Sequence, residues 1–207
     1  MIGPGLSLEQ KAFVAQLIEA GAANSAQRLS HYTKVSWSVA SSSIELMTIA
    51  GALDALPVDA STFLGVHMRS RPPQSPLTME SLILFPSTAT QSLLEAAARA
   101  ISPRTAALPN WVDAMAGEIA NVIGQALVKA MADRFGSSII LSVPFVSSGP
   151  KPLLLAKVLD RVGSKRETIV FGQVELAAQG HPASCTMMIV FELNQLRRFQ
   201  VPPQHPI

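Results

Sequence analysis

The chain has 207 residues, of which 48% are hydrophobic, and its 16 basic and 14 acidic residues give a formal net charge of +2. This length suits one large domain or two small halves that share a core. Aromatic residues make up only 5% and do not interleave with Lys and Arg, which argues against a nucleic-acid-binding protein.

Neither a membrane protein nor a secreted one is expected. No segment has the roughly 20 consecutive apolar residues of a membrane helix. The first residues lack the basic start and apolar run of a signal peptide. The single cysteine, Cys185, cannot form an internal disulfide, which fits a reducing compartment and predicts a cytoplasmic protein. We expect Cys185 to be a small buried hydrophobe rather than a nucleophile.

The four histidines give no sign of a metal site. His31, His67, His181 and His205 are scattered without the spacing of metal ligands, so surface or structural roles are expected. The sequence predicts no metal and no cofactor of the chain's own.

The first half of the chain begins with a helix. Ser7 and Gln10 have the spacing of a capping box, which predicts a helix that runs to about Leu29. Alternating polarity then predicts strands, and Gly and Pro mark the breaks. The expected order is a strand at Val35–Val39, a short extended piece and a helical turn across Ile44–Leu56, a strand at Thr62–Ser70, a loop at Arg71–Pro76, a strand at Ser81–Phe85 and a helix from Pro86 to about Ile101.

The second half begins with a longer amphipathic helix. Asn110 is its predicted N-cap, supported by Asp113 in the first turn, and Gly136 is its predicted end. One face carries an apolar stripe of helical period, and the opposite face carries Glu118, Asn121, Gln125 and Lys129. The expected order after it is a strand at Ser138–Val146 interrupted by Pro144, a helix at Pro152–Val162, strands at Glu167–Leu176 and Cys185–Leu193, and a short helix at Asn194–Phe199.

The two halves repeat each other. A shift of 102 residues places Gln16 on Glu118 and Glu19 on Asn121, and both halves have the same order of elements. We predict one α+β domain over residues 1–207, in which two pseudo-symmetric repeats form a mostly antiparallel sheet covered by helices. Repeat 1 is expected at about 7–101, a linker at 102–109, repeat 2 at about 110–199 and a loose tail at 200–207.

Glu118 and Asn121 are the candidate functional residues. Residues three apart share one helix face, so the carboxylate and the carboxamide should point the same way. Glu118 alone says little, since Glu is a good helix former, but Asn is unfavourable inside a helix. A solvent-exposed face without function remains the alternative. No nucleophile beside a base and no phosphate-binding glycine loop accompanies the pair, which suits chemistry that a partner completes.

Several segments, in order, resemble the CheC/CheX/FliY family of bacterial chemotaxis phosphatases. Ala116–Gly124 is similar to the family's signature helix, as is the spacing of 22 residues between Asn121 and Pro144. Gly21–Ser30 resembles the first-repeat stretch GAGNAATALS, and Leu82–Pro86 followed by a helix resembles the middle segment. The resemblance covers about Ser7 to Phe199, and the motifs follow one another in the same order as in CheC.

The resemblance implies a function and a role for each residue. Such proteins remove phosphate from the aspartyl phosphate of CheY-like receiver domains. Glu118 would pair with the receiver's active-site lysine, and Asn121 would orient a water for in-line attack. The receiver would hold its own Mg²⁺, so this chain would need no cofactor. A phosphorylated CheY-like receiver is the expected partner, with CheD as a second candidate.

The sequence departs from the family pattern at three places. Ala114 stands where Asp or Ser often precedes the Glu by four residues, and Asp113 lies one residue earlier. The first-repeat site reads Gln16-x-x-Glu19 instead of Glu-x-x-Asn, and a carboxylate at Glu19 would repel a phosphoryl group. Ser42 matches Pro144 there. We therefore predict that the Gln16/Glu19 site is inactive or much weaker.

Two further hypotheses about the function remain open. A chain of this shape could bind a receiver or CheD without hydrolysis, as the resemblance to the middle domain of the flagellar switch protein FliM allows. An unrelated α+β ligand-binding domain is the third possibility, although no polar cluster in the sequence marks a pocket.

Overall fold

The computed structural model describes residues 6–57, 61–71, 78–87, 97 and 109–196. The helices within them are α1 (Leu8–Thr33), α2 (Ile49–Asp54), α4 (Trp111–Phe135), α5 (Lys151–Leu159) and α6 (Leu193–Leu196). The strands are β1 (Trp37–Thr48), β2 (Thr62–Ser70), β3 (Met79–Pro86), β4 (Phe145–Pro150), β5 (Thr168–Ala178) and β6 (Ser184–Glu192). No described helix combines the length and the apolar character that crossing a membrane requires.

The strands form one antiparallel sheet in the order β1-β5-β6-β3-β2-β4. Exchanging β1 with β4, β2 with β5 and β3 with β6 reverses this order and leaves it otherwise unchanged. The sheet therefore has a pseudo-twofold axis between β6 and β3, and the predicted α+β fold of two pseudo-symmetric repeats is confirmed. The boundaries predicted for the repeats stay predictions, because most of the linker and the whole tail lie outside the described residues.

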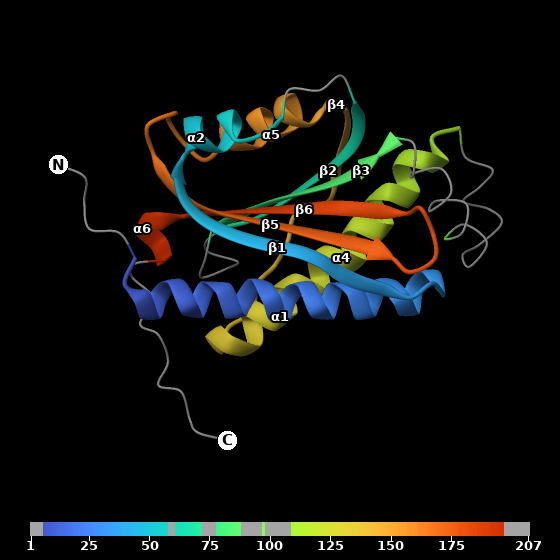
Figure 1. Ribbon diagram of the computed structural model, residues 1–207, viewed down its shortest axis with the longest axis horizontal. Helices are drawn as coiled ribbons and strands as arrows, with labels where there is room; N and C mark the ends of the chain where they lie inside the picture. Colours follow the sequence, from blue (N-terminus) through green and yellow to red (C-terminus); the bar gives the residue numbers. More distant parts are fainter. Residues whose placement is uncertain (1–5, 58–60, 72–77, 88–96, 98–108, 197–207) are drawn as a thin grey trace.

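Helices cover both faces of the sheet (Figure 1). One core lies between the sheet and α1 and α4, and includes Ile18, Ile123 and Phe191. A second core lies between the opposite face and α2 and α5, and includes Ile49, Leu154 and Met188. Successive side chains of β3 and β6 point alternately into the first and the second core. Both faces of these strands are therefore buried, which explains their continuous apolar sequences.

The capping box begins α1 as predicted. The Ser7 hydroxyl accepts a hydrogen bond from the Gln10 backbone N–H at 3.1 Å, and Gln10 Oε1 accepts one from the Ser7 N–H at 3.0 Å. Lys34 ends the helix in the left-handed region at φ 59°. The helix is therefore one turn longer than its sequence pattern indicated.

Helices α1 and α4 run in opposite directions and pack tightly against each other (Figure 1). A Cβ on Gly21 would lie 2.4 Å from Leu127 Cδ1, so a side chain at this position would push the helices apart. One turn later the buried Ser25 hydroxyl bonds to the Ile123 carbonyl oxygen, at 3.0 Å, and to the Gly21 carbonyl oxygen. The shift of 102 residues carries the Gly21–Leu127 contact onto Ile123–Ser25, so the repeat symmetry passes through this helix pair.

Three local predictions are wrong. The strand predicted at Val35–Val39 and the extended piece predicted from Ile44 are one continuous strand, β1. Residues 138–144 are not a strand: β4 begins only at Phe145, one residue after Pro144, which has no backbone N–H to donate to β2. Asn110 occupies the N-cap position of α4, but its side chain makes no capping hydrogen bond. The expected helix from Pro86 to about Ile101, the loop Arg71–Pro76 and the end of the last helix lie largely outside the described residues.

A buried carboxylate marks one end of β2 and β3. Glu80, with a side chain only 1% exposed, accepts a hydrogen bond from Arg71 Nη2 at 3.0 Å and contacts His67 Nε2. A buried carboxylate needs such partners, because removing one would leave a charge without compensation. His67 therefore has a structural role, as its scattered position in the sequence indicated.

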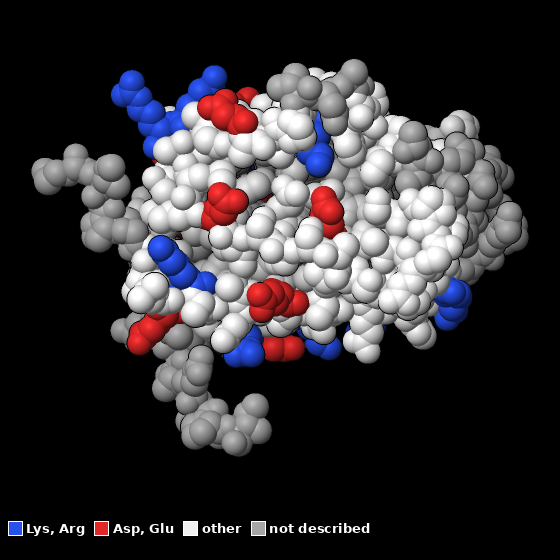
Figure 2. All heavy atoms as spheres, in the orientation of Figure 1, with Lys and Arg blue, Asp and Glu red and all other residues white. Residues whose placement is uncertain are grey.

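Charge is spread thinly over the molecule. Figure 2 shows one face, on which acidic side chains stand singly and basic ones lie mostly towards the margins. Neither sign forms a broad patch on this face, in keeping with the small net charge.

The Gly21–Leu127 contact predicts a large effect of a single substitution. Gly21→Leu should lower the free energy of unfolding by about 2 kcal/mol or more, because the new side chain has no space against α4. Ala23→Leu, on the exposed side of the same helix, should change it by no more than about 0.5 kcal/mol. Urea denaturation monitored by circular dichroism measures both, and equal effects would contradict the tight contact.

Burial predicts an inert thiol. Cys185 lies in the α1/α4 core, and burial raises its pKa to about 12, so almost no reactive thiolate exists near neutral pH. Iodoacetamide at mildly alkaline pH should leave the folded protein unmodified and alkylate the urea-unfolded chain, as read by mass spectrometry. Rapid modification of the folded protein would show that the thiol is accessible.

Candidate functional site

Glu118 and Asn121 lie on one face of α4, one turn apart. Glu118 is exposed, and Asn121 is half-buried at the wall of a groove. Neither side chain is packed against the sheet, because the buried stripe of α4 contains Met115, Ile119 and Ile123 instead. The predicted pair is therefore accessible to a partner.

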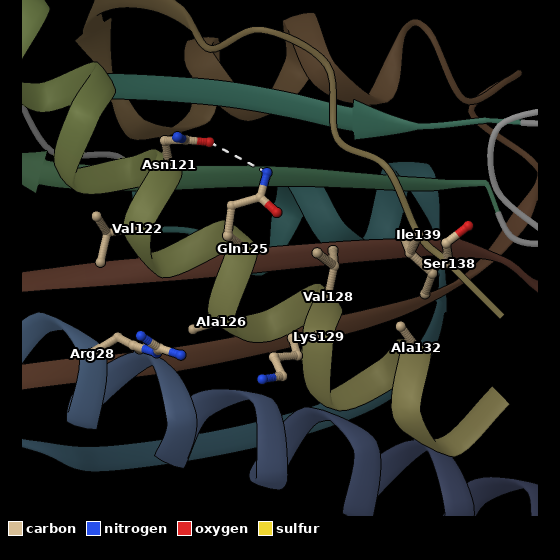
Figure 3. A pocket seen from close by; sticks show the side chains of 10 residues that line it. All are labelled: Arg28, Asn121, Val122, Gln125, Ala126, Val128, Lys129, Ala132, Ser138 and Ile139. Atoms are coloured by element: carbon tan, nitrogen blue, oxygen red, sulfur yellow. Dashed lines mark hydrogen bonds between the residues drawn. The ribbon is translucent and has the colours of Figure 1, made fainter. Parts of the chain in front are cut away.

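The groove beside Asn121 has a volume of about 560 Å³. Its polar lining residues are Arg28, Asn121, Gln125, Lys129 and Ser138, and its apolar ones are Val122, Ala126, Val128, Ala132 and Ile139. Figure 3 shows these side chains around the groove, with Arg28 reaching from α1 and the others placed on α4 or at Ser138 and Ile139. The sequence placed Gln125 and Lys129 on the same face as Asn121, but it gave no sign of Arg28 or Ser138.

Gln125 makes a long hydrogen bond to Asn121. Its side-chain amide donates a hydrogen bond to Asn121 Oδ1 at 3.5 Å, across one turn of α4 (Figure 3). This length is beyond the usual range for such a bond, so the contact is weak. A carbonyl oxygen has two lone pairs, and one of those on Asn121 is thus left for a water or a ligand.

The segment before β4 runs back along α4. Leu141 and Met68 lie so close to Gly124 that a Cβ there would be 2.9 Å and 2.7 Å from their side chains. Pro144 reaches the level of Gly117, where its Cβ lies 3.8 Å from the position of a Gly117 Cβ. The contacts at Gly124 leave little space for a side chain there, whereas a Cβ on Gly117 would meet Pro144 at an ordinary van der Waals distance. Pro144 therefore lies against the turn of α4 that contains Gly117.

Large apolar side chains are exposed along this segment. Val143 is 85% exposed, Phe145 60% and Ile140 55%. Val143 and Phe145 flank Pro144, which packs against the turn of α4 that contains Gly117 and, as its exposed neighbour, Glu118. Exposed apolar groups that cluster beside polar ones are typical of surfaces that contact another protein.

Tyr32 reports on the electrostatics around Glu118. Burial, and secondly the negative charge of Glu118, raise the pKa of the Tyr32 hydroxyl. Glu118 on α4 therefore acts across the helix pair on a side chain of α1.

The corresponding site of the first repeat has a different character. Gln16 and Glu19 are both exposed on α1, so the structure places them as the sequence symmetry indicated. Glu19 stands where Asn121 stands in the second repeat, and its negative charge would repel a phosphoryl group, which a neutral amide does not. Whether this site is inactive stays a prediction.

A metal site is not found in the part of the chain that the structure describes. Nowhere among those residues do three His, Cys, Asp or Glu side chains come together in a way that could hold a metal ion.

Sequence comparison and structural comparison give different results. No protein-family model matches the sequence, and no curated protein matches it. FliY from Thermotoga maritima superposes with a TM-score of 0.67 at 13% identity, over 95% of each chain. The FliM of a FliG–FliM complex from H. pylori gives 0.64 at 12%, over 92% of this chain and 98% of that one. CheX from Vibrio vulnificus gives 0.57 at 15%, over 86% and 100%.

The chain has the fold of the CheC/CheX/FliY proteins. The expectation drawn from the short motifs is confirmed at this level, over nearly the whole chain. At 12 to 15% identity the likeness establishes the fold and leaves the activity to be argued from the site.

Removing the Glu118 charge should lower the Tyr32 pKa. Glu118→Gln takes away the carboxylate that disfavours the tyrosinate, while burial, the larger cause, still keeps the pKa above its ordinary value. Tyr32 is the only tyrosine of the chain, so absorbance near 295 nm during alkaline titration reports on it alone. Asp54→Asn, on α2 at the opposite face of the sheet, is the control and should leave the pKa unchanged. An unchanged pKa in Glu118→Gln would place the carboxylate away from Tyr32.

Proposed function

We propose that the protein is a phosphatase that hydrolyses the aspartyl phosphate of a CheY-like receiver domain. The observation that carries this proposal is the accessible Glu118/Asn121 pair on one face of α4, in a fold shared with CheX and FliY. Asn121 meets the groove through its carboxamide, and Glu118 projects from the adjacent turn. Both groups can approach a partner at the same time.

In the proposed reaction Asn121 orients the attacking water. The free lone pair on Asn121 Oδ1 accepts a hydrogen bond from the water and directs its oxygen at phosphorus. The oxygen–phosphorus bond forms as the bond from phosphorus to the aspartate oxygen breaks. The products are the free carboxylate and inorganic phosphate, and the proton lost by the water passes to phosphate or solvent.

Glu118 fixes the partner rather than taking part in bond making. An exposed carboxylate on a rigid helix is suited to pair with the lysine of a receiver's active site, and this would set the distance between Asn121 and phosphorus. The receiver would supply Mg²⁺, so this chain contributes only positioning. No general base is needed, because an acyl phosphate has a good carboxylate leaving group.

The surroundings of the pair favour a protein substrate. Val143 and Phe145 expose large apolar surface near Glu118, and a small phosphorylated metabolite would leave them uncovered. A docked domain would bury them together with the polar pair.

A direct assay tests the proposal. A panel of receiver domains is phosphorylated with a small phosphodonor, and loss of the phosphoryl group is followed with and without the protein in Mg²⁺. The wild-type protein should accelerate dephosphorylation of at least one receiver. Asn121→Ala should lower that acceleration about 100-fold, as expected when one group that positions the reacting centre is lost. Glu118→Gln should act mainly by weakening receiver binding.

Gln16→Ala is the matched control in the first-repeat site. It should keep wild-type activity, because the negative charge of Glu19 beside it would repel the phosphoryl group and keep this site out of the reaction. If the wild-type protein is no faster than every receiver alone, the phosphatase proposal is wrong. Full activity in Asn121→Ala would instead reject the site assignment.

A binding module without hydrolysis is the second candidate. It is favoured by one observation: the fold is also that of a FliM that was solved in complex with FliG. In this case the Glu118 surface would hold a partner and Asn121 would have no catalytic effect. Stable binding of a phosphorylated receiver without faster loss of phosphate would identify this function.

A further inference from the structure

The groove beside Asn121 carries two positive charges that come from different repeats. Arg28 extends from α1 and Lys129 from α4, and both line the groove that Asn121 borders (Figure 3). The two residues are 101 positions apart in the sequence, and the packing of α1 on α4 brings them together. This constellation has no role in the hydrolysis step described above.

The two cations have no acidic partner in contact with them in the described part of the chain. Neither Arg28 nor Lys129 forms an ion pair with a described residue, and no Asp or Glu lines the groove. Asn121, Gln125 and Ser138 add neutral groups that can donate hydrogen bonds to an anion. Glu118 lies one turn from Asn121 but is not part of the lining.

The pseudo-symmetry shows that this charge is particular to one site. At the symmetry-related site around Glu19, Gln27 of α1 takes the position of Lys129, and Ala130 of α4 takes that of Arg28. Glu19 replaces Asn121 there, so the corresponding surface has lost both cations and gained an acid. The positive groove thus occurs where the Glu-x-x-Asn pair occurs and is absent where the pair is absent.

We propose that Arg28 and Lys129 bind acidic side chains on the surface of the phosphorylated partner near its phosphoaspartate, other than the carboxylates that hold Mg²⁺. This inference rests on the proposed function: a partner whose phosphoryl group meets Asn121 reaches the groove that Asn121 lines. Carboxylates near the phosphoryl group then face two unpaired cations, and the phosphoryl charge adds to the attraction. The groove selects receivers with such an acidic rim and orients them so that Glu118 meets a positive group.

The form of the groove favours the surface of a protein over a small anion. Arg28 and Lys129 are both exposed at its rim, where flexible cations meet side chains that arrive on a partner's surface. A dedicated site for a small phosphate compound would instead have buried donors that strip it of water. Apolar Ile140 and Val143 are exposed on the neighbouring segment and extend the same surface.

The test compares two charge reversals of equal size. Arg28→Glu/Lys129→Glu reverses the groove, and Lys157→Glu/Arg161→Glu reverses two exposed cations at α5, on the opposite side of the sheet. Receiver domains of the panel are loaded with Mg²⁺ and beryllofluoride, which imitates the phosphoryl group without being hydrolysed. Their dissociation constants for each full-length variant are measured by biolayer interferometry, and circular dichroism confirms folding.

The groove variant should bind the receiver at least about tenfold more weakly than wild type at about 50 mM salt, and the difference should narrow at about 500 mM. The α5 variant should stay within about twofold of wild type. In the phosphatase assay the groove variant should raise KM with little change in kcat, because its residues dock the receiver and do not touch the water. Arg28→Lys should keep most of the affinity.

The outcomes separate this inference from the proposed function. If the two charge-reversed variants bind the receiver with equal affinity and the wild type is active, the proposed role of the groove is wrong and the phosphatase proposal stands. If the wild type binds the receiver in a charge-dependent way but does not hydrolyse the phosphoaspartate, the proposed role of the groove stands and the phosphatase proposal is wrong. Failure to bind any receiver overturns both. If inorganic phosphate perturbs the Arg28 side-chain NMR signal at about 1 mM and the groove reversal leaves receiver affinity unchanged, the groove is a small-anion site and the proposal is wrong.

Discussion

The close packing of α1 against α4 is the contact on which the rest of the structure depends. It needs the missing side chain of Gly21, which lets Leu127 approach, and the buried hydroxyl of Ser25, which bonds to the carbonyl oxygen of Ile123. The same contact joins the two repeats, sets one wall of the first core and fixes the level at which Arg28 stands beside Asn121. If the two helices packed less closely, Arg28 on α1 would lie farther from Asn121 and Lys129 on α4, and the groove would lose one of its charges.

Symmetry and its loss explain why one site is the stronger candidate. The fold requires both long helices for its core, so their buried faces are constrained in both repeats. Their outer faces are free of that constraint. Glu118 and Asn121 lie on such a face, as do Gln16 and Glu19, and the two pairs have diverged without cost to the core. Lys129 and Arg28 lie beside the Glu118/Asn121 pair, and no cation takes the equivalent positions beside Gln16 and Glu19.

Much of the fold could be predicted because most elements have strong local signals. The Ser7/Gln10 capping box, the apolar stripe of α4 and the alternation in β2 each depend on neighbouring residues alone. The prediction failed at residues 138–144, where apolar residues alternate as in a strand but pack along α4 through Leu141 and Pro144. Asn110 likewise has the right residue type for a cap without the hydrogen bond. Contacts distant in sequence decided the outcome at residues 138–144, whereas the Asn110 backbone, at φ −113° and ψ 33°, lacks the extended conformation typical of an N-cap.

The sequence by itself determined the spacing of Glu118 and Asn121 on one helix face, since helical period alone sets it, and the repeat that marks Gln16 and Glu19 as their counterparts. Only the tertiary structure decided which groups surround the pair. Arg28 on α1, Pro144 with its exposed apolar neighbours and the groove beside Asn121 come together through the packing of helices and a segment that are far apart along the chain. Local periodicity carries no information on such contacts, because they are fixed by how the two repeats share one core.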